Sequence, residues 1–521
     1  MERKSPVSAS VVLVLTLASS ALLPLSLPNP IFSYGSPLLG IVALIPLYIA
    51  IKVTRTLRLA VYSGIVFGAF STAFGSFWLA FFEDFSAWAI GGPVLGYMAY
   101  NALLFTFLYK AMQTRLPFRP LYFAVIWTGY ELLKSIGFLG YPWGLVAYSW
   151  NEVIPFIQIA DIFGVYAISF LLVLANTVLA EWLHGVRSRA LIQLTALLAV
   201  LSGITWVYGF TALQRETHLR AELDIVMVQN NGDPWAPGVF WDQLEHTQNL
   251  TLDALQHSEG NPDLIIWSES ILRIPLDDQR SLYRSNPRGL PFLQFIAELP
   301  ADLLTGGAYT IDSEKSDMIN AALLIDRSGT IQQVYGKQQL VPMVETIPFF
   351  EFSPVRSFFQ NVVGLRSMWL SGMEYRMFPI TTTEGIQLQY GTPICFEDAF
   401  AYITRDMVHE GADFFINLTN NSWSKTESAQ TQHLAAARFR SIETRRTLIR
   451  STNSGYTSVI DPWGRVTVSL PMFTESALRT KVEIRTPIRE PIQLFIGNAF
   501  GWLCIAVAAA GLGIQYKRPP T

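Results

Sequence analysis

The sequence predicts an α/β domain combined with a set of membrane helices. Three observations lead to this fold class. Hydrophobic residues make up 51% of the 521-residue chain, charged residues make up only 15%, and the longest apolar runs lie outside a middle region of ordinary composition. Soluble domains carry about 25% charged residues, so we expect part of this chain to lie in lipid. The net charge of −3 gives no reason to expect nucleic-acid binding.

Long apolar runs occupy the first part of the chain and recur near its end. A helix needs about 20 mainly apolar residues to cross a bilayer. The basic start followed by an apolar run also suits a cleavable signal peptide, but the later runs favour an uncleaved anchor. We expect eight transmembrane spans, at residues 8–27, 37–53, 59–82, 88–110, 120–139, 156–182, 190–210 and 491–515.

Lysine and arginine occur in alternate loops between these spans. Loops 28–36, 83–87 and 140–155 contain neither residue, whereas the intervening loops and both ends of the chain contain several. Because basic loops stay on the cytoplasmic side, we expect both termini to be cytoplasmic and the middle region to lie across the membrane. The predicted domains are residues 1–211 with seven spans, residues 212–490, and residues 491–521 with the eighth span and a short tail.

The charged residues well inside the predicted spans include Glu131, Lys134 and Asp161. Glu131 and Lys134 lie three positions apart on one helix face and are expected to pair. Intramembrane charges often mark a functional site, but a pair that neutralises itself within a bundle is explained equally well as a structural contact. Asp161 in the sixth span leaves the same two alternatives open.

The middle region alternates strand-like and helix-like patterns. Helical periodicity is clear at residues 240–256 and 429–446. Strands that alternate with amphipathic helices predict an α/β arrangement in layers. The predicted strands are residues 223–229, 264–270, 303–309, 321–329, 386–395, 413–420 and 448–461.

Cys395 ends the strand-like run IQLQYGTPIC and precedes a helical pattern that closes at Gly411. The dipole and free N–H groups of a helix N-terminus favour a thiolate, so we expect this position to lower the pKa of the Cys395 thiol. A buried apolar role also explains this residue when it is taken alone. The second of the two cysteines, Cys504, lies in an apolar run, and this usage does not indicate a disulfide framework.

Three reactive side chains occur at or near strand ends. Glu269 follows LIIW, Lys337 follows a Tyr-Gly pair, and Cys395 ends its strand. Each has a structural explanation by itself, as a helix cap, a solvent-facing lysine or a core residue. Together, in this order, they resemble the Glu-Lys-Cys triad of the nitrilase (carbon–nitrogen hydrolase) superfamily.

The resemblance extends over nearly the whole chain. The segments GYPWGLVAYS, WSES, YGKQQLVPMVETIP, ICFED and NLTNNSWSKT, with eight spans and a domain before the last one, are similar to those of bacterial apolipoprotein N-acyltransferases. The resemblance implies a nitrilase-like αββα sandwich on the periplasmic side of the bacterial inner membrane. Phe396 stands where tyrosine is usual, and Asn-Asn-Gly-Asp before Trp235 replaces a more usual Gly-Asn.

The resemblance also implies a mechanism. Cys395 would be the nucleophile, Glu269 the general base, and Lys337 with the backbone N–H of Phe396 the stabilisers of the oxyanion. A phospholipid such as phosphatidylethanolamine would acylate the cysteine. The α-amino group of the diacylglyceryl-cysteine of an apolipoprotein would then accept the acyl chain in a ping-pong scheme. The supporting or substrate-binding residues would be Glu345, Phe396, Glu397 and Trp235, with no metal or cofactor.

Other interpretations of the sequence remain open at this stage. The same triad would serve a membrane-anchored amidase or nitrilase that uses water as the acceptor. A thiol-protease-like pair of Cys395 and His433 suits the order of the two residues, and a non-enzymatic transporter or scaffold is a further alternative. The long aromatic segment 347–378 is either an irregular packed loop or a mobile lid that admits acyl chains.

Overall fold

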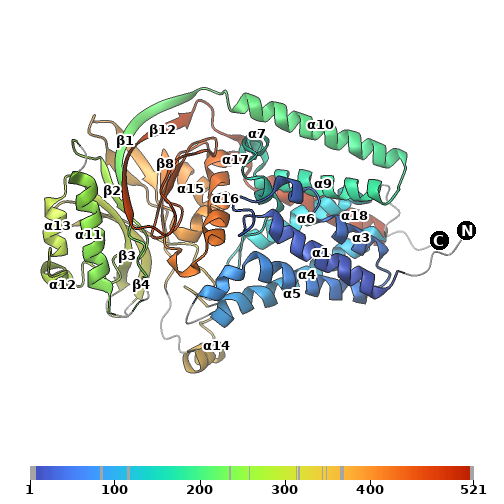
Figure 1. The fold of residues 1–521 in the computed structure, drawn as a ribbon, viewed down its shortest axis with the longest axis horizontal. Coiled ribbons are helices and arrows are strands. Elements are labelled where there is room, and N and C mark those ends of the chain that lie inside the picture. The colour runs from blue at the N-terminus through green and yellow to red at the C-terminus, as the bar shows by residue number, and fades with distance from the viewer. Residues whose placement is uncertain are drawn as a thin grey trace, which may run out of the picture. The chain divides into compact units, whose positions relative to one another are not determined.

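The computed structural model describes residues 7–516, apart from 83–85, 114–117, 234–235, 237, 257–258, 313, 315–316, 343, 348 and 364–368. The chain forms two compact units. Met1–Arg215, Thr426–Phe439 and Pro491–Thr521 make up the first unit, and Glu216–Lys425 and Arg440–Glu490 make up the second. Residues 426–439 thus join the first unit, although the sequence placed them within the middle domain. The first unit is helical, and the second contains both β-sheets (Figure 1).

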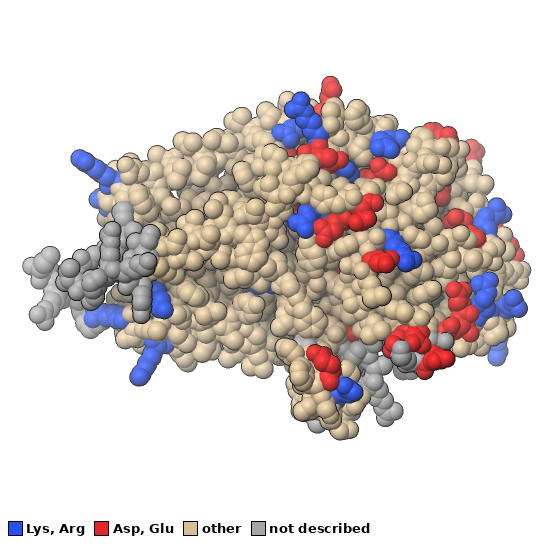
Figure 2. Space-filling model, turned by 180° about the vertical axis from the view of Figure 1, so that it is seen from behind, with Lys and Arg blue, Asp and Glu red and all other residues tan. Residues whose placement is uncertain are grey.

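Within the described residues, five helices of the first unit are long and apolar enough to cross a membrane. Figure 2 shows this unit as a broad surface without charged side chains, bounded at its far end by lysine and arginine. Such a surface suits contact with lipid, because an uncompensated charge is costly in the bilayer. The five helices are α1 (Ala9–Ser26), α4 (Leu57–Gly75), α5 (Ser86–Met112), α9 (Val165–Leu183) and α10 (Arg189–Ala212).

The remaining predicted spans form helices that are shorter or more polar, and their crossing of a membrane stays a prediction. The second span is interrupted, and the fifth forms the 17-residue helix α6 (Arg119–Ser135), which carries Glu131 and Lys134. The sixth span begins with two short helices before α9, because Gly164 turns the chain at a φ of 70°. The other elements of these spans are α2 (Pro37–Gly40), α3 (Ile45–Val53), α7 (Ile154–Ile157), α8 (Ala160–Phe163), α17 (Ile492–Ile496) and α18 (Ala499–Tyr516).

Glu131 and Lys134 attract each other electrostatically, as the sequence predicts, but they make no direct ion pair among the described contacts. Lys134 Nζ donates to the carbonyl oxygen of Trp143 at 2.6 Å. Glu131 Oε1 accepts from Trp127 Nε1 at 3.0 Å and from the backbone N–H of Val146 at 2.9 Å. The loop after α6 folds back to supply a partner to each charge, which helical spacing alone does not reveal.

Two six-stranded sheets form the core of the second unit, in the orders β12-β1-β2-β3-β4-β5 and β11-β10-β9-β8-β7-β6. Parallel pairs lie at the centre of each sheet and antiparallel pairs at its edges. The first sheet contains β1 (Thr217–Gln229), β2 (Leu264–Trp267), β3 (Leu303–Asp312), β4 (Asp317–Ile325), β5 (Ile331–Gly336) and β12 (Ser476–Pro487). The second contains β6 (Phe378–Thr381), β7 (Gln387–Gly391), β8 (Phe414–Thr419), β9 (Leu448–Thr452), β10 (Ser458–Ile460) and β11 (Val466–Ser469).

Helices cover the outer faces of both sheets, which gives the αββα order of layers (Figure 1). On the first sheet, Trp267 packs between aromatic side chains from the helical side, including Phe295 at a ring distance of 5.6 Å. On the second sheet, α15 (Ala401–His409) lies so close to β7 that Met407 contacts Gly391. The other outer helices are α11 (Phe240–Gln256), α12 (Arg280–Ser285) and α13 (Phe292–Glu298). Helix α16 (Glu427–Thr444) is divided between the two units after Phe439.

All seven predicted strand regions contain strands. The region 448–461 splits into β9 and β10, and β2 ends at Trp267, so that Glu269 lies beyond the strand. Helix α11 has the predicted bounds. The sequence analysis missed β5, β6, β11 and β12, which lie toward the edges of the two sheets.

Candidate active site

Cys395 begins a 3-10 turn that runs to Ala399, between β7 and α15. Its backbone has a φ of 50°, a left-handed conformation that is strained for a residue with a side chain. The Asn417 side chain on β8 holds this conformation, because its Nδ2 donates to the carbonyl oxygens of Pro393 and Cys395 at 3.0 and 3.1 Å. The buried thiol is therefore presented from a backbone that neighbouring strands fix.

The environment of Cys395 keeps its thiol protonated. Burial raises the pKa of the Cys395 thiol well above its ordinary value, and the charge of Glu269 and a hydrogen bond to it raise it further, against the opposing charge of Lys337. The prediction of a lowered pKa is therefore wrong. Helix α15 begins only at Ala401, so its N-terminus is not directly at the sulfur, and the loss of hydration dominates.

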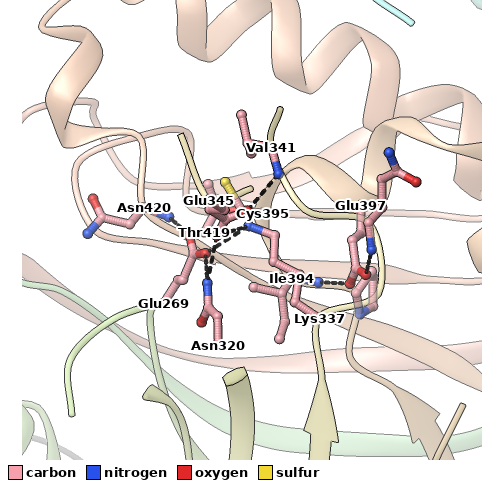
Figure 3. Close-up of polar contacts among 12 residues, drawn as sticks. Glu269, Asn320, Lys337, Val341, Glu345, Ile394, Cys395, Glu397, Thr419 and Asn420 are labelled. Atoms are coloured by element: carbon pink, nitrogen blue, oxygen red, sulfur yellow. Dashed lines mark hydrogen bonds and ion pairs between the residues drawn. The ribbon is translucent and has the colours of Figure 1, made fainter. Parts of the chain in front are cut away.

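Lys337 follows β5, and its ammonium lies between two carboxylates (Figure 3). Nζ is 3.2 Å from Glu269 Oε1 and 2.9 Å from Glu345 Oε1, and the side chain is only 1% exposed. Burial works to lower the pKa of Lys337, but the two carboxylates outweigh burial and raise it above its ordinary value. Lys337 is therefore a fixed positive charge at neutral pH.

Glu269 is oriented by donors from three parts of the unit. Its Oε1 accepts from Lys337 Nζ and from Asn320 Nδ2, the latter at 2.8 Å. Its Oε2 accepts from the backbone N–H of Asn420, directly after β8, at 2.8 Å. The structure thus brings together Glu269, Lys337 and Cys395, which the sequence analysis had selected from three separate stretches.

Two further residues hold the carboxylates and the thiol in place, and the sequence analysis missed both. Asn320 on β4 donates from the same Nδ2 to Glu269 and to Glu345 Oε1, the latter at 3.0 Å. Asn421 lies near the sulfur, with its Oδ1 3.8 Å from Cys395 Sγ. Asn320 therefore links the two acids that flank Lys337.

Glu345 contacts the ammonium of Lys337. Its second oxygen accepts from the backbone N–H of Val341 at 2.8 Å, which fixes the carboxylate against its own loop. The side chain is thereby held toward the ammonium of Lys337 and the amide of Asn320.

Glu397 contacts backbone groups rather than the Lys337 side chain in the described hydrogen bonds. The residue is fully buried, and its carboxylate also accepts from the Tyr335 hydroxyl at 3.1 Å. Through these bonds the carboxylate joins the segment after Lys337 to the residue before Cys395. The backbone donors are the N–H groups of Gln338 at 2.7 Å, Gln339 at 3.0 Å and Ile394 at 2.7 Å.

Because the pKa of the Glu397 carboxyl is raised, we expect the stability of the protein to depend on pH. Burial raises its pKa from 4.5 to about 7, although the backbone N–H groups favour the ionised form. Between these pH values the unfolded chain releases the proton while the folded chain keeps it, so stability falls as pH rises. The difference between the two pKa values corresponds to about 3 kcal/mol in the free energy of unfolding. We expect thermal unfolding midpoints measured from pH 5 to pH 8 to fall less steeply for Glu397→Gln than for the unchanged protein, and equal slopes would contradict this.

A buried ion pair anchors the far side of the Cys395 turn. Arg450 Nε on β9 donates to Asp398 Oδ2 at 2.9 Å, with both side chains at most 1% exposed. Removal of one partner of such a pair leaves an uncompensated buried charge. The turn that carries the thiol is therefore fastened to two strands of the second sheet, β8 through Asn417 and β9 through Arg450.

Several other residues that the sequence singled out lie elsewhere. Trp235 is outside the described residues. The ring of Phe396 packs on Phe400 at 4.7 Å. His433 belongs to the first unit, where its ring lies 5.4 Å from that of Trp143. Asp161, also in the first unit, accepts from the Tyr208 hydroxyl at 2.6 Å and pairs with Arg215.

The segment 347–378 returns to the site through its backbone. The N–H of Trp369 donates to the carbonyl oxygen of Glu345 at 3.2 Å, and the N–H of Gly372 donates to that of Lys337 at 2.8 Å. The segment contains the short helix α14 (Ser353–Phe358), and its exposed apolar side chains include Phe349, Phe352 and Met373, the last 90% exposed. Its movement as a lid stays a prediction.

The two-sheet fold and the cysteine site define a carbon–nitrogen hydrolase domain. Residues 227–486 match the family model described as carbon-nitrogen hydrolase. Residues 19–178, in the helical unit, match the model described as apolipoprotein N-acyltransferase N-terminal domain.

Relatives match over almost the full length of the chain. Apolipoprotein N-acyltransferase 2 of Treponema denticola is 38% identical over 94% of this chain and 94% of its own. Apolipoprotein N-acyltransferase 2 of Treponema pallidum is 34% identical over 95% and 93%, and apolipoprotein N-acyltransferase of Borreliella burgdorferi is 31% identical over 92% and 91%. The chain belongs to the apolipoprotein N-acyltransferase family, and it is an acyltransferase with a carbon–nitrogen hydrolase domain.

Proposed function

We propose that this enzyme transfers a fatty acyl chain from a membrane phospholipid, through a thioester on Cys395, to the α-amino group of the N-terminal S-diacylglyceryl-cysteine of apolipoproteins. The observation that carries the proposal is the convergence of a buried thiol, a carboxylate and a fixed ammonium in a member of this family. The apolar helices support it further, because both substrates are lipids or carry lipid.

In the first half-reaction, Glu269 takes the proton from Cys395 as the sulfur attacks the ester carbonyl carbon of the phospholipid. Lys337 and the backbone N–H of Phe396 stabilise the negative oxygen that forms. The carbon–oxygen bond of the ester then breaks, and Glu269 returns the proton to the departing lysophospholipid oxygen. The acyl chain stays on the enzyme as a thioester.

In the second half-reaction, the free amine of the apolipoprotein attacks the thioester carbonyl carbon. Glu269 removes a proton from the amine nitrogen, and the carbon–sulfur bond breaks to give an amide and the Cys395 sulfur, which regains a proton. Asn320 and the backbone N–H of Asn420 keep the Glu269 carboxylate directed throughout both halves. Glu345 holds Lys337, and Glu397 holds the backbone on either side of the site.

We place the enzyme in the bacterial inner membrane, with both termini cytoplasmic and the catalytic domain facing the periplasm. The distribution of lysine and arginine among the short loops supports this orientation. Phosphatidylethanolamine is the proposed acyl donor. The chemistry described needs neither a metal nor an organic cofactor.

The test uses the intact mass of the Cys504→Ala protein, in which Cys395 is the one remaining thiol. Incubation with phosphatidylethanolamine is expected to add one fatty acyl chain. A peptide that begins with diacylglyceryl-cysteine is expected to remove that chain and become N-acylated. If water removes the chain as fast as the peptide does, the protein is an amidase-like hydrolase instead. If no lipid forms an adduct with folded protein, the proposed role of the triad is wrong.

A further inference from the structure

A cavity of about 60 Å³ lies within the first unit, between α1, α4, α5, α6 and the loop that follows α6. This volume is enough for about four water molecules, or for one tetrahedral oxyanion of similar size. Leucine, proline, phenylalanine and tryptophan form part of its wall. The polar side chains that line it include Ser76, Tyr97, Tyr130, Glu131, Lys134 and Tyr141.

Lys134 gives this cavity a positive charge that makes no direct ion pair within the described contacts, although the Glu131 carboxylate lines the same cavity and attracts it. An ammonium has three N–H donors, and the one acceptor recorded for Lys134 Nζ is the carbonyl oxygen of Trp143. The rings of Tyr97 and Tyr130 lie 5.6 and 5.8 Å from Nζ. Ring faces favour the charge but do not replace an oxygen acceptor, so two donors remain for a ligand.

The hydroxyl groups around the cavity add further donors. The Tyr130 hydroxyl accepts from Asn101 Nδ2 at 3.3 Å, which leaves its own proton available. Tyr141 and Ser76 share one hydrogen bond at 3.0 Å, so one proton of the two hydroxyls also remains. Glu131 Oε1 already accepts from Trp127 and Val146 N–H. Glu131 Oε2 has no hydrogen-bond partner among the described residues and is a competing acceptor, but the two remaining Lys134 donors and the two hydroxyl protons outnumber it, which leaves donors for an oxyanion.

The position of Lys134 indicates where such an oxyanion comes from. Lys134 is the penultimate residue of α6, the fifth predicted span, and the stacked rings of Tyr141 and Trp143 follow it. Tyrosine and tryptophan concentrate at the level of lipid headgroups. A phosphate group of a lipid lies at this level.

We propose that the Lys134 cavity binds the phosphate group of a membrane phospholipid. Lys134 supplies the opposite charge, and Tyr130 with the Tyr141–Ser76 pair supplies hydroxyl donors. The inference goes beyond acyl transfer, because the cavity lies wholly in the first unit and the binding involves no covalent step. Retention of a lipid there does not require a reactive Cys395.

Native mass spectrometry of the full chain in detergent tests this proposal. Every protein carries Cys395→Ala, so that no acyl adduct forms and the result is independent of the proposed reaction. The probe is phosphatidylethanolamine, titrated onto delipidated protein. We expect Lys134→Met to weaken lipid retention about tenfold or more, since a charge-assisted hydrogen bond is lost. Lys134→Arg and Lys110→Met, a change of an exposed lysine at the end of α5, are expected to retain the lipid.

Tyr130→Phe is a second variant that leaves the contact between Lys134 and the Trp143 carbonyl in place. We expect a loss of about fivefold in retention from the missing hydroxyl donor. If Lys134→Met does not fold, lipid retention by Tyr130→Phe tests the proposal in its place. The proposal is wrong if the folded variants retain the lipid as strongly as the parent protein does. Binding of millimolar inorganic phosphate that Lys134→Met abolishes, in a parent protein that retains no phosphatidylethanolamine, would indicate an oxyanion site and overturn the lipid as its source.

Discussion

Alanine at position 395 is expected to lower the rate of acyl transfer by at least about 10⁴-fold, because the proposed mechanism passes through a thioester on this side chain. The remaining site would still bind both substrates, so the loss should appear in kcat rather than in KM. The measurement is multiple-turnover transfer from phosphatidylethanolamine to a diacylglyceryl-cysteine peptide.

The second cysteine supplies the matched control for this change. Cys504 is buried in α18 of the first unit, and Cys504→Ala is expected to retain the full rate. Cys395→Ser is expected to lower the transfer rate almost as much as Cys395→Ala does, since a hydroxyl is far harder to deprotonate than a thiol. A folded Cys395→Ala protein with more than about one hundredth of the normal rate would contradict a covalent mechanism.

Replacement of Lys337 by methionine is expected to impair both stability and catalysis. The change leaves Glu269 and Glu345 buried without their shared cation, and removal of one partner of a buried pair costs about 3 to 5 kcal/mol. In the proposed mechanism Lys337 also stabilises the oxyanion, so its loss is expected to lower kcat by about 10²-fold to 10³-fold in addition. Denaturant unfolding in detergent and the transfer assay measure the two effects separately.

A double variant distinguishes the loss of charge from the loss of packing. When Glu345→Gln accompanies Lys337→Met, one of the two unpaired carboxylates is removed, so the protein should recover part of its stability without recovering activity. Lys481→Met is the surface control, because its side chain is 68% exposed and pairs with Glu222. Equal stability losses for Lys481→Met and Lys337→Met would contradict the electrostatic explanation.

Local patterns in the sequence were sufficient for much of the architecture. The alternation of apolar and polar residues located the central strands, and helical periodicity located α11 with its observed bounds. Membership of the acyltransferase family was predicted from the order of separated motifs and is confirmed by the relatives. The edge strands were missed because one side faces solvent. β12 (SALRTKVEIRTP), for example, is rich in charged residues.

The partners within the site depend on three-dimensional register, which local patterns do not determine. Asn320 lies opposite Lys337 across the β4–β5 hairpin, and the backbone N–H of Lys337 donates to its carbonyl oxygen. A count from the turn places Gly336 opposite Asn320, because a register shift near Ile325 moves the pairing by one residue. Such a shift reverses the face on which a side chain lies.

Ionisation was also misjudged from the sequence, and the reason is burial. The position of Cys395 before a helix suggested a thiolate, but the thiol is enclosed and lies beside the Glu269 carboxylate. Desolvation of a buried group depends on every side chain around it. The two carboxylates that flank Lys337, those of Glu269 and Glu345, are distant from the cysteine in the sequence.

The protonated state of Cys395 has a consequence for the survival of the enzyme. Thiolates, rather than thiols, react with peroxides and with disulfides. The Cys395 thiol is neutral and enclosed, so it is poorly reactive toward such oxidants while the site is idle. In the periplasm, where we propose that the catalytic domain lies, this arrangement would protect the one thiol that the proposed mechanism uses.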